Sequence, residues 1–421
     1  MGLGARGCGG RLLAARVVLL PLGRMRIGQV VIAGAGLAGL RTAEELRARG
    51  YDGALTMIGA EPRPPYDRPP LTKKFMTGEI DDTSLRADMD ALGTDLRLRE
   101  AATGLGDGVL RTEKADFPFD ALVIATGATP VRLPGPGPQR VLRTFDHAAA
   151  LRSALRPGLK LAVVGAGWIG AELATSAARQ GCQVTVVEAA PAPLAGALGA
   201  EAGSRTVPWY AAAGVDLRLG QPVESVEPGG LALPGGGWLA ADEVVTAIGV
   251  RPEVGWLAGS GVLLENGVAV DEALRASVPG IFAAGDCAAF VSRRFGRRLR
   301  VEHWDSAIHA PEVVAANILG GDERYDPVPY FWSEQFGRMV QYCGQHSPGD
   351  KLLWRGDTDG RDWAACWLAG DRLTGERLTA VLAVSRPRDL LQGRRLIAAG
   401  TPVDPVRLAD PAVPLRDATA G

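Results

Sequence analysis

Two glycine-rich turns carry the chemistry that is easiest to recognise in this chain of 421 residues. In the first turn, Gly34, Gly36 and Gly39 follow an apolar strand and open a helical pattern, and Glu61 comes 22 residues beyond Gly39. Glycines at this spacing let the backbone approach a pyrophosphate at a helix N-terminus, and an acid at this distance can accept hydrogen bonds from ribose hydroxyls. The pattern predicts a dinucleotide-binding site.

The second turn repeats this arrangement with Gly165, Gly167 and Gly170, and Glu188 follows 18 residues beyond Gly170. The 131 residues between Gly34 and Gly165 indicate an internal duplication. One such turn alone is compatible with a tight turn in a Rossmann-like sheet that binds nothing, but two complete copies favour binding. Two adenine dinucleotides on one chain indicate a flavin and a nicotinamide.

Apolar strands alternate with helical patterns around both turns, which is typical of parallel sheets with crossover helices. Residues 29–50 and 160–181 each predict a strand, a glycine turn and an amphipathic helix. Residues 121–127 and 243–253 predict two crossings between domains. The segment around Asp286 places this acid at the carboxyl end of a further strand, where ligands of open α/β sheets gather.

The pattern changes at about residue 326 to short apolar runs followed by one helical stretch, and the residues after 401 are expected to run over the surface. The expected fold class is therefore α/β, with two Rossmann-like dinucleotide-binding domains for FAD and NAD and a small C-terminal α+β interface domain.

Composition excludes several classes of protein. The 46 basic and 47 acidic residues give a net charge of −1, so bulk charge predicts neither nucleic-acid nor membrane binding. The cysteines show no C-x-x-C spacing, which argues against a dithiol reductase and favours a reducing, cytoplasmic compartment. With four histidines and no H-E-x-x-H, no metal site is predicted.

The first 25 residues contain an apolar run that imitates a secretory signal, but Arg11 and Arg16 interrupt it. Because Met25 immediately precedes the first predicted strand, residues 1–25 are expected to be an extension outside the fold, from a start codon assigned too early. Removal of residues 1–24 should then leave flavin content and activity unchanged. No other segment is long and apolar enough to span a bilayer.

Several ordered motifs accompany the glycine turns: PPYDRPPLTK at 64–73, ATG at 125–127, GIFAAGDCA at 280–288, RVEHWDSA at 300–307 and PYFWSEQFG at 329–337. On these motifs the chain resembles the putidaredoxin reductase-like family, the FAD-dependent NADH:ferredoxin reductases of bacterial P450 and Rieske oxygenase systems. Rubredoxin reductase and apoptosis-inducing factor are related to this family. The resemblance runs from about residue 27 almost to the C-terminus.

The resemblance implies domain boundaries. It assigns 26–130 plus 247–325 to an FAD-binding domain, 131–246 to an NAD-binding domain and 326–421 to a C-terminal reductase domain.

The resemblance also implies roles for individual residues. The FAD pyrophosphate would lie on the first glycine turn, Glu61 would hold the adenosine ribose, and Ala102 would touch the adenine through its backbone. Asp286 would bind the ribityl chain, and Trp304 would offer its backbone to the flavin ring. The complete set expected to bind FAD or NAD is Gly34, Gly36, Ala38, Gly39, Glu61, Arg68, Lys73, Ala102, Ala125, Thr126, Gly127, Arg143, Gly165, Gly167, Ile169, Gly170, Glu188, Gly249, Asp286, Trp304 and Trp332.

Lys73 and Glu172 are the catalytic candidates that the resemblance implies, as an ion pair beside the flavin that steadies the charge created when a hydride arrives. Glu172 is expected in the first turn of its helix, and the alternative is that the helix dipole alone favours an acid there. Trp168 replaces the smaller residue expected in the second glycine turn, which leaves its effect on NADH binding open. Glu188 predicts a preference for NADH over NADPH, because its carboxylate repels a 2′-phosphate.

The function implied is electron transfer from NADH through FAD to an acidic [2Fe–2S] ferredoxin. The alternatives are a rubredoxin reductase, another NADH-dependent acceptor reductase, or a redox-switched interaction protein like apoptosis-inducing factor. Five arginines in a predicted hairpin, together with Trp332, are candidates for ferredoxin docking, although such a hairpin can also be simply solvated. These arginines are Arg293, Arg294, Arg297, Arg298 and Arg300.

Overall fold

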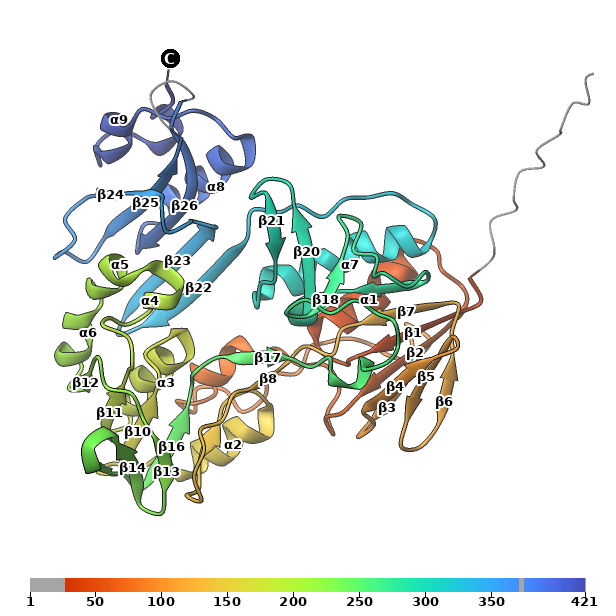
Figure 1. Ribbon diagram of the computed structural model, residues 1–421, viewed down its shortest axis with the longest axis horizontal. Coiled ribbons are helices and arrows are strands. Elements are labelled where there is room, and N and C mark those ends of the chain that lie inside the picture. Colours follow the sequence, from red (N-terminus) through yellow and green to blue (C-terminus); the bar gives the residue numbers. More distant parts are fainter. Residues whose placement is uncertain (1–26, 371–374, 421) are drawn as a thin grey trace, which may run out of the picture.

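The computed structural model describes residues 27–370 and 375–420, and within these ranges three five-stranded sheets organise the chain (Figure 1). The proposed N-terminal extension, residues 1–25, lies outside the described residues. In the described part of the chain, no helix is long and apolar enough to cross a membrane.

The first unit is built on a parallel sheet with the strand order β19-β7-β1-β2-β3. Its strands are β1 (Gln29–Ala33), β2 (Ala54–Gly59), β3 (Thr94–Leu98), β7 (Ala121–Ile124) and β19 (Ile281–Ala283). Helices α1 (Leu37–Ala48) and α7 (Trp304–Ile318) pack together against it. Two small sheets flank them, made of β4 (Ala102–Gly106), β5 (Val109–Thr112) and β6 (Asp116–Pro118), and of β18 (Val268–Val270), β20 (Ala288–Ser292) and β21 (Arg297–Leu299).

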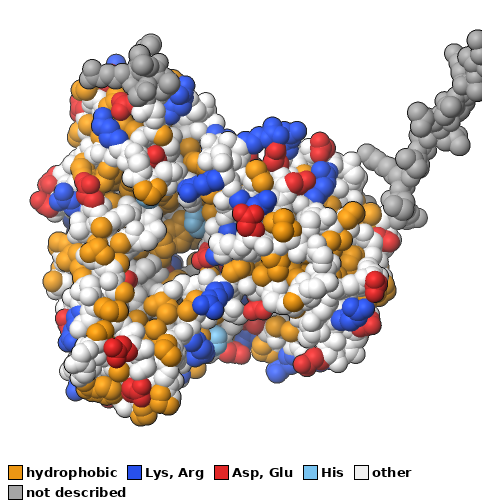
Figure 2. All heavy atoms as spheres, in the orientation of Figure 1, with side chains coloured by type: hydrophobic (Ala, Val, Ile, Leu, Met, Phe, Trp, Pro, Cys, Tyr) orange, Lys and Arg blue, Asp and Glu red, His pale blue; other side chains and the backbone are white. Residues whose placement is uncertain are grey.

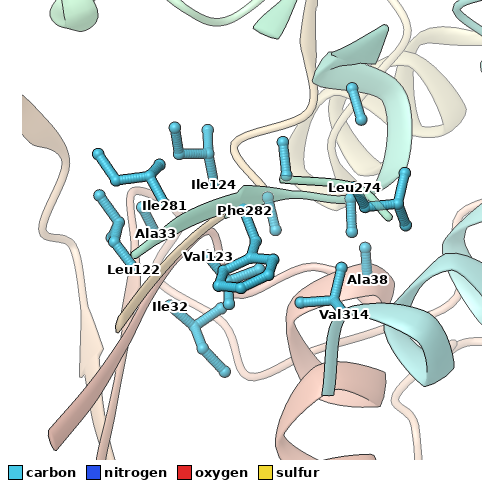
Figure 3. Packing of buried hydrophobic residues seen from close by; sticks show 14 of the residues in the cluster. Ile32, Ala33, Ala38, Leu122, Val123, Ile124, Leu274, Ile281, Phe282 and Val314 are labelled. Carbon is cyan, nitrogen blue, oxygen red and sulfur yellow. The ribbon is translucent and has the colours of Figure 1, made fainter. Parts of the chain in front are cut away.

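The core of this unit joins segments that are far apart in the sequence. Figure 3 shows the ring of Phe282 between the strand residues Ile32 and Val123 and the helix residues Ala38 and Val314. Because parallel strands are covered on both faces, their side chains form nearly continuous apolar runs. The sheet is complete only when β19 pairs with β7, which in turn pairs with β1 near residue 30.

The second unit repeats the first in its topology, with the parallel order β12-β11-β10-β16-β9. Its strands are β9 (Arg140–Val141), β10 (Lys160–Val164), β11 (Gln183–Val187), β12 (Asp216–Arg218) and β16 (Glu243–Thr246). Its helices are α2 (Phe145–Ala154), α3 (Trp168–Arg179), α4 (Ala195–Leu198), α5 (Ala200–Ser204) and α6 (Val207–Ala212), and a small sheet contains β13 (Ser225–Glu227), β14 (Gly230–Leu233) and β15 (Gly237–Ala240). The order β16-β10-β11-β12 matches β7-β1-β2-β3, as the internal duplication predicts.

The two predicted crossings pair with each other. Strand β8 (Ala128–Pro130) runs antiparallel to β17 (Val250–Pro252), and both are visible between the two units in Figure 1. Gly127 immediately precedes β8, and Gly249 immediately precedes β17. Their φ angles are +72° and +101°, a region that favours glycine. The Thr126 hydroxyl donates to the Glu253 carbonyl at 2.5 Å, which ties the two crossings together.

The C-terminal unit has an antiparallel sheet with the order β22-β23-β26-β25-β24. These strands are β22 (Tyr330–Gln335), β23 (Arg338–Gly344), β24 (Lys351–Arg355), β25 (Trp363–Ala369) and β26 (Arg377–Val384). Helix α8 (Pro387–Ala399) packs on the sheet, and α9 (Pro405–Ala409) follows. The expected fold class, two Rossmann-like units and a small α+β unit, is confirmed.

The expectation that residues after 401 run over the surface is wrong. Leu408 and Leu415 are fully buried, and the backbone around them covers Arg355, whose side chain is 1% exposed. The guanidinium forms an ion pair with Asp389 at 3.0 Å and donates to the carbonyls of Leu408 at 3.0 Å and Val413 at 2.6 Å. A buried cation needs such acceptors, so the last residues complete the C-terminal unit.

Candidate functional site

In the first glycine turn, Gly34 and Gly39 are packed tightly against backbone, whereas Gly36 faces open space. A Cβ on Gly34 would lie 2.0 Å from the Ala125 carbonyl oxygen, and one on Gly39 would lie 2.0 Å from the Gly34 carbonyl oxygen. A Cβ on Gly36 would meet nothing within 4 Å. Gly36 is the N-cap of α1, whose first amides have no side-chain cap and no acid in the first turn. Packing therefore requires two of the glycines, while the third leaves space for an anionic group at a helix N-terminus.

The second glycine turn has the same geometry. A Cβ would lie 2.5 Å from the Ala247 carbonyl oxygen at Gly165 and 2.0 Å from the Gly165 carbonyl oxygen at Gly170, whereas Gly167 faces open space. Helix α3 also lacks a side-chain cap and an acid in its first turn. A cavity beside it is lined by Gly167, Trp168, Glu188, Ala190, Leu194, Ala195, Gly196 and Ala197. Both cradles therefore fit a pyrophosphate.

The two acids after the glycine turns lie where the spacing predicts, just beyond β2 and β11. Glu61 accepts hydrogen bonds from Arg68 at 2.5 Å and from the Tyr66 hydroxyl at 2.6 Å. Glu188 accepts the backbone amides of Ala166 at 2.7 Å and Ala190 at 2.8 Å. A carboxylate has about four acceptor positions, so each acid can brace its own loop and still accept a ribose hydroxyl.

Asp286 lies in the turn after β19, as predicted, and it meets a side chain from the other unit. Its carboxylate is 2.7 Å from the Arg143 guanidinium, and Arg300 donates to its backbone carbonyl at 3.1 Å. Arg300 also pairs with Glu302 at 2.7 Å, and burial raises the pKa of Glu302. The structure therefore brings Arg143 and Asp286 together at the junction of the two units.

His303 follows Glu302 and is half-buried beside this junction. Burial lowers the pKa of His303 to about 4, so its ring is neutral at pH 7. Its Nδ1 has no hydrogen-bond partner among the described residues, and its ring lies 5.4 Å from that of Phe331. Phe331 in turn lies 4.7 Å from Trp168 at the start of α3, so Trp168 packs against the C-terminal unit.

Lys73 and Glu172 form the predicted ion pair, with 2.7 Å between Nζ and the carboxylate. The lysine comes from the loop after the 3₁₀ helix Pro69–Thr72, and the glutamate, 3% exposed, comes from α3 in the second unit. The expectation that Glu172 lies in the first turn is wrong, because α3 begins at Trp168 and Glu172 is its fifth residue. The helix dipole falls off within the first turn, so it does not explain the buried acid.

Three further side chains around this pair were not predicted from the sequence. Thr72 donates to Glu172 at 2.5 Å, Ser333 donates to the other carboxylate oxygen at 2.6 Å, and Gln335 donates to the Ser333 hydroxyl at 3.0 Å. Ser333 and Gln335 belong to the motif PYFWSEQFG. Because they are two residues apart, a strand places both side chains on the same face, and this spacing was the signal in the sequence that could have grouped them. All three units therefore meet at the Glu172 carboxylate.

Trp332 points away from Ser333 and joins an aromatic cluster. Its ring lies 5.7 Å from that of Trp304 and 6.0 Å from that of Tyr330. Trp304 is 38% exposed and donates to the Asp67 carboxylate at 2.8 Å, while burial raises the pKa of Asp67. Of the remaining predicted residues, Ala102 begins β4 and packs against the core of the first unit, and Ile169 lies in the first turn of α3 beside Gly167, with its side chain exposed.

The five hairpin arginines differ in whether their guanidinium groups are held by the protein or are exposed to a partner. Arg298 donates to the carbonyls of Val270 and Ala289, and Arg294 donates to the last carbonyls of α8. Arg300 is held at the Asp286 junction, as described above. Arg293 and Arg297 are exposed, and Figure 2 shows basic side chains along the edge that carries β20 and β21.

Two similar nucleotide cradles joined by a buried ion pair define a dinucleotide-dependent oxidoreductase, and comparisons with known proteins agree. The pyridine nucleotide-disulphide oxidoreductase model matches residues 28–310, and the reductase C-terminal model matches residues 330–419. The chain therefore belongs to the pyridine nucleotide-disulphide oxidoreductase family.

Individual relatives cover nearly the whole chain. The anthranilate 1,2-dioxygenase system ferredoxin–NAD(+) reductase component of Burkholderia cepacia is 37% identical, over 92% of this chain and 98% of the relative. Among solved structures, Fdr9 has 50% identity and a TM-score of 0.88, over 92% of this chain and 99% of the other. The covalent putidaredoxin reductase–putidaredoxin complex has 29% identity and a TM-score of 0.87, over 92% and 97%.

The prediction of an FAD-dependent oxidoreductase with FAD and NAD as cofactors is confirmed by this membership. The cysteines in the described part of the chain, Cys182, Cys287, Cys343 and Cys366, are all free and buried. Burial raises the pKa of Cys343 and of Cys366 to about 12, which keeps these thiols protonated and unreactive.

Proposed function

We propose that this chain is an NADH-dependent reductase that passes electrons from NADH through FAD to a [2Fe–2S] ferredoxin serving a P450 or an aromatic-ring dioxygenase. The Lys73–Glu172 pair carries the proposal, because it joins the loop of the first unit to the nucleotide helix of the second. Relatives are named as ferredoxin–NAD(+) reductase components of dioxygenase systems, and one solved neighbour is a covalent complex of putidaredoxin reductase with putidaredoxin. We place the enzyme in the cytoplasm, where NADH is supplied.

The proposal divides the chain between the cofactors. Residues 26–130 plus 247–325 would hold FAD, residues 131–246 would hold NADH, and residues 326–421 would form the interface with the partner. The three five-stranded sheets support this division, since one lies in each part.

The residues act by holding the cofactors and placing charge. When bound, FAD accepts a hydride and releases electrons one at a time. The amides behind Gly36 and Gly167 receive the two pyrophosphates, while Arg143 and Asp286 orient the flavin chain at the junction of the units. Lys73 places a partly buried positive charge where negative charge develops, and the buried Glu172 holds that ammonium in position.

The proposed function is tested with purified protein and a [2Fe–2S] ferredoxin. We expect a yellow protein with one FAD, rapid loss of flavin absorbance on mixing with NADH, and cytochrome c reduction that requires the ferredoxin. Reduction of rubredoxin instead would favour that alternative acceptor. A reduced flavin that persists in the presence of every acceptor would indicate a redox-switched interaction protein.

NADH should be preferred over NADPH. The Glu188 carboxylate would accept the ribose hydroxyls and repel a 2′-phosphate, and its place beside the second cradle supports this role. Glu188→Gln keeps the shape but removes the charge, so we expect the ratio of kcat/KM for NADH to that for NADPH to fall about tenfold. Equal kcat/KM for the two nucleotides in the unmodified protein would contradict the assignment.

Docking of an acidic ferredoxin should depend on Arg293 and Arg297, which are exposed, and on Trp332, which is half-buried in its aromatic cluster. Charge reversal by Arg297→Glu should lower ferredoxin-dependent cytochrome c reduction, and salt should lower it too, since the Debye length shrinks from about 30 Å at 0.01 M to about 8 Å at 0.15 M. NADH-to-ferricyanide turnover should change little. Arg298 is unsuitable for this test, because its carbonyl partners make it part of the fold.

Arg111→Glu provides the matched control, because Arg111 is an exposed arginine on β5, on the separate sheet at the other edge of the first unit (Figure 1). If Arg111→Glu and Arg297→Glu lowered ferredoxin-dependent activity equally, the hairpin would have no docking role.

A further inference from the structure

The Glu172 carboxylate, which belongs to the second unit, accepts hydrogen bonds from the other two units, and only one of its donors is the lysine of the proposed mechanism. One carboxylate oxygen accepts Lys73 and Thr72 from the first unit. Within the described ranges, the other oxygen accepts only Ser333, from β22 of the C-terminal unit, at 2.6 Å. Removal of the Ser333 hydroxyl would therefore leave one oxygen of a buried carboxylate without any donor.

Gln335 determines the direction of that hydrogen bond. Its Nε2 donates to the Ser333 oxygen at 3.0 Å, so the single hydroxyl proton of Ser333 remains free to point at Glu172. Both Ser333 and Gln335 are fully buried. The Gln335 Oε1 has no partner among the described residues, and such a buried oxygen is unfavourable for stability. What this side chain contributes is therefore the donation to Ser333.

From this relay we infer that Ser333 and Gln335 are positioning residues for hydride transfer: they lock the Glu172 carboxylate so that it holds the Lys73 ammonium at the flavin. The inference rests on the proposed function, and it assigns to the C-terminal unit a part in the NADH half of the reaction. Neither side chain needs to touch a cofactor. A carboxylate anchored at one oxygen only can rotate, and the ammonium then loses its fixed position.

Ser333→Ala tests the inference in the FAD-loaded protein by stopped-flow reduction with increasing NADH. We expect the limiting rate of flavin reduction to fall about tenfold, the loss typical of one charge-assisted hydrogen bond, with the apparent Kd for NADH unchanged. Ser333→Thr retains the hydroxyl and should restore the rate. Gln335→Met leaves the Ser333 hydroxyl free to turn away, so it should give an intermediate loss.

A second readout follows Lys73 without any turnover. The chain has only five lysines, so amine labelling by reductive methylation can be followed at each one by mass spectrometry. Lys73 is 14% exposed, whereas the neighbouring Lys74 is exposed and serves as an internal standard. We expect Ser333→Ala to raise the labelling rate of Lys73 several-fold relative to Lys74.

The matched control is Ser176→Ala. Ser176 is buried on the same helix and donates its hydroxyl to the Thr72 carbonyl at 2.7 Å, whereas the donors to Glu172 in the described part of the chain are Lys73, Thr72 and Ser333. Unchanged Lys73 labelling in Ser333→Ala, or an equal loss of rate in Ser176→Ala, would overturn the inference. If NADH failed to reduce the unmodified protein, the proposed function would fail, and the labelling experiment would still decide the role of Ser333.

Discussion

Lys73→Met is expected to retain FAD and to accept a hydride from NADH about 100-fold more slowly, the loss typical of removing one preorganised group that stabilises developing charge. The lysine is the cation paired with the buried Glu172 carboxylate, and methionine keeps much of its aliphatic length without the charge. The measurement is the limiting rate of flavin absorbance loss at saturating NADH. Wild-type flavin content in the variant would show that the rate, and not assembly, has changed.

The double variant Lys73→Met/Glu172→Gln separates rate from stability. The single change leaves a buried carboxylate without its cation, which destabilises a fold by several kcal/mol, and the second change removes that charge. We expect the double variant to regain the thermal stability lost in the single variant while its hydride transfer stays slow. Recovery of the rate together with stability would show that Lys73 supports folding only.

Arg355→Met is expected to lower the free energy of unfolding by about 3 kcal/mol, because it leaves the carbonyls of the last residues without donors in a buried site. Asp389 keeps its second cation, Arg386, at 2.5 Å, so the change does not leave a buried carboxylate unpaired. The expected loss of stability is therefore smaller than the largest values measured for broken buried ion pairs. Chemical denaturation followed by tryptophan fluorescence measures the change.

Arg140→Met is the matched control, since Arg140 pairs with Glu243 at 2.7 Å but is 35% exposed, and the pair should contribute less than about 1 kcal/mol. An equal effect of the two changes would contradict the structural role of Arg355.

The glycine turns could be predicted from the sequence because their spacing is local: each loop, its strand and its helix lie within about twenty residues. The Asp286 turn was recognisable for the same reason. The partnership of Ser333 with Glu172 was not, because 161 residues separate them and only the packing of the C-terminal unit brings β22 to α3. Patterns within one element say little about which elements will meet.

Two expectations failed for definite physical reasons. The first turn of α3 was placed too late, because the glycine spacing does not mark the residue where the helix begins. The residues after 401 resemble a surface tail because their buried apolar side chains, such as Leu408 and Leu415, are isolated among polar residues and prolines. For the hairpin arginines, a run of charges suggests side chains that are all solvated. In the structure, Arg294 and Arg298 instead donate to backbone carbonyls of other segments.

The first unit is discontinuous in the chain, since β19 completes its sheet only at residues 281–283, whereas the second unit is contiguous between β9 and β16. During synthesis on the ribosome, segments fold once their partners have emerged. All strands of the second sheet are available after residue 246, before Asp286 and α7 exist. The second glycine cradle is thus complete while the first still lacks one wall. With the cofactors assigned as proposed, the order of translation makes the nascent chain competent to bind the nicotinamide before the flavin.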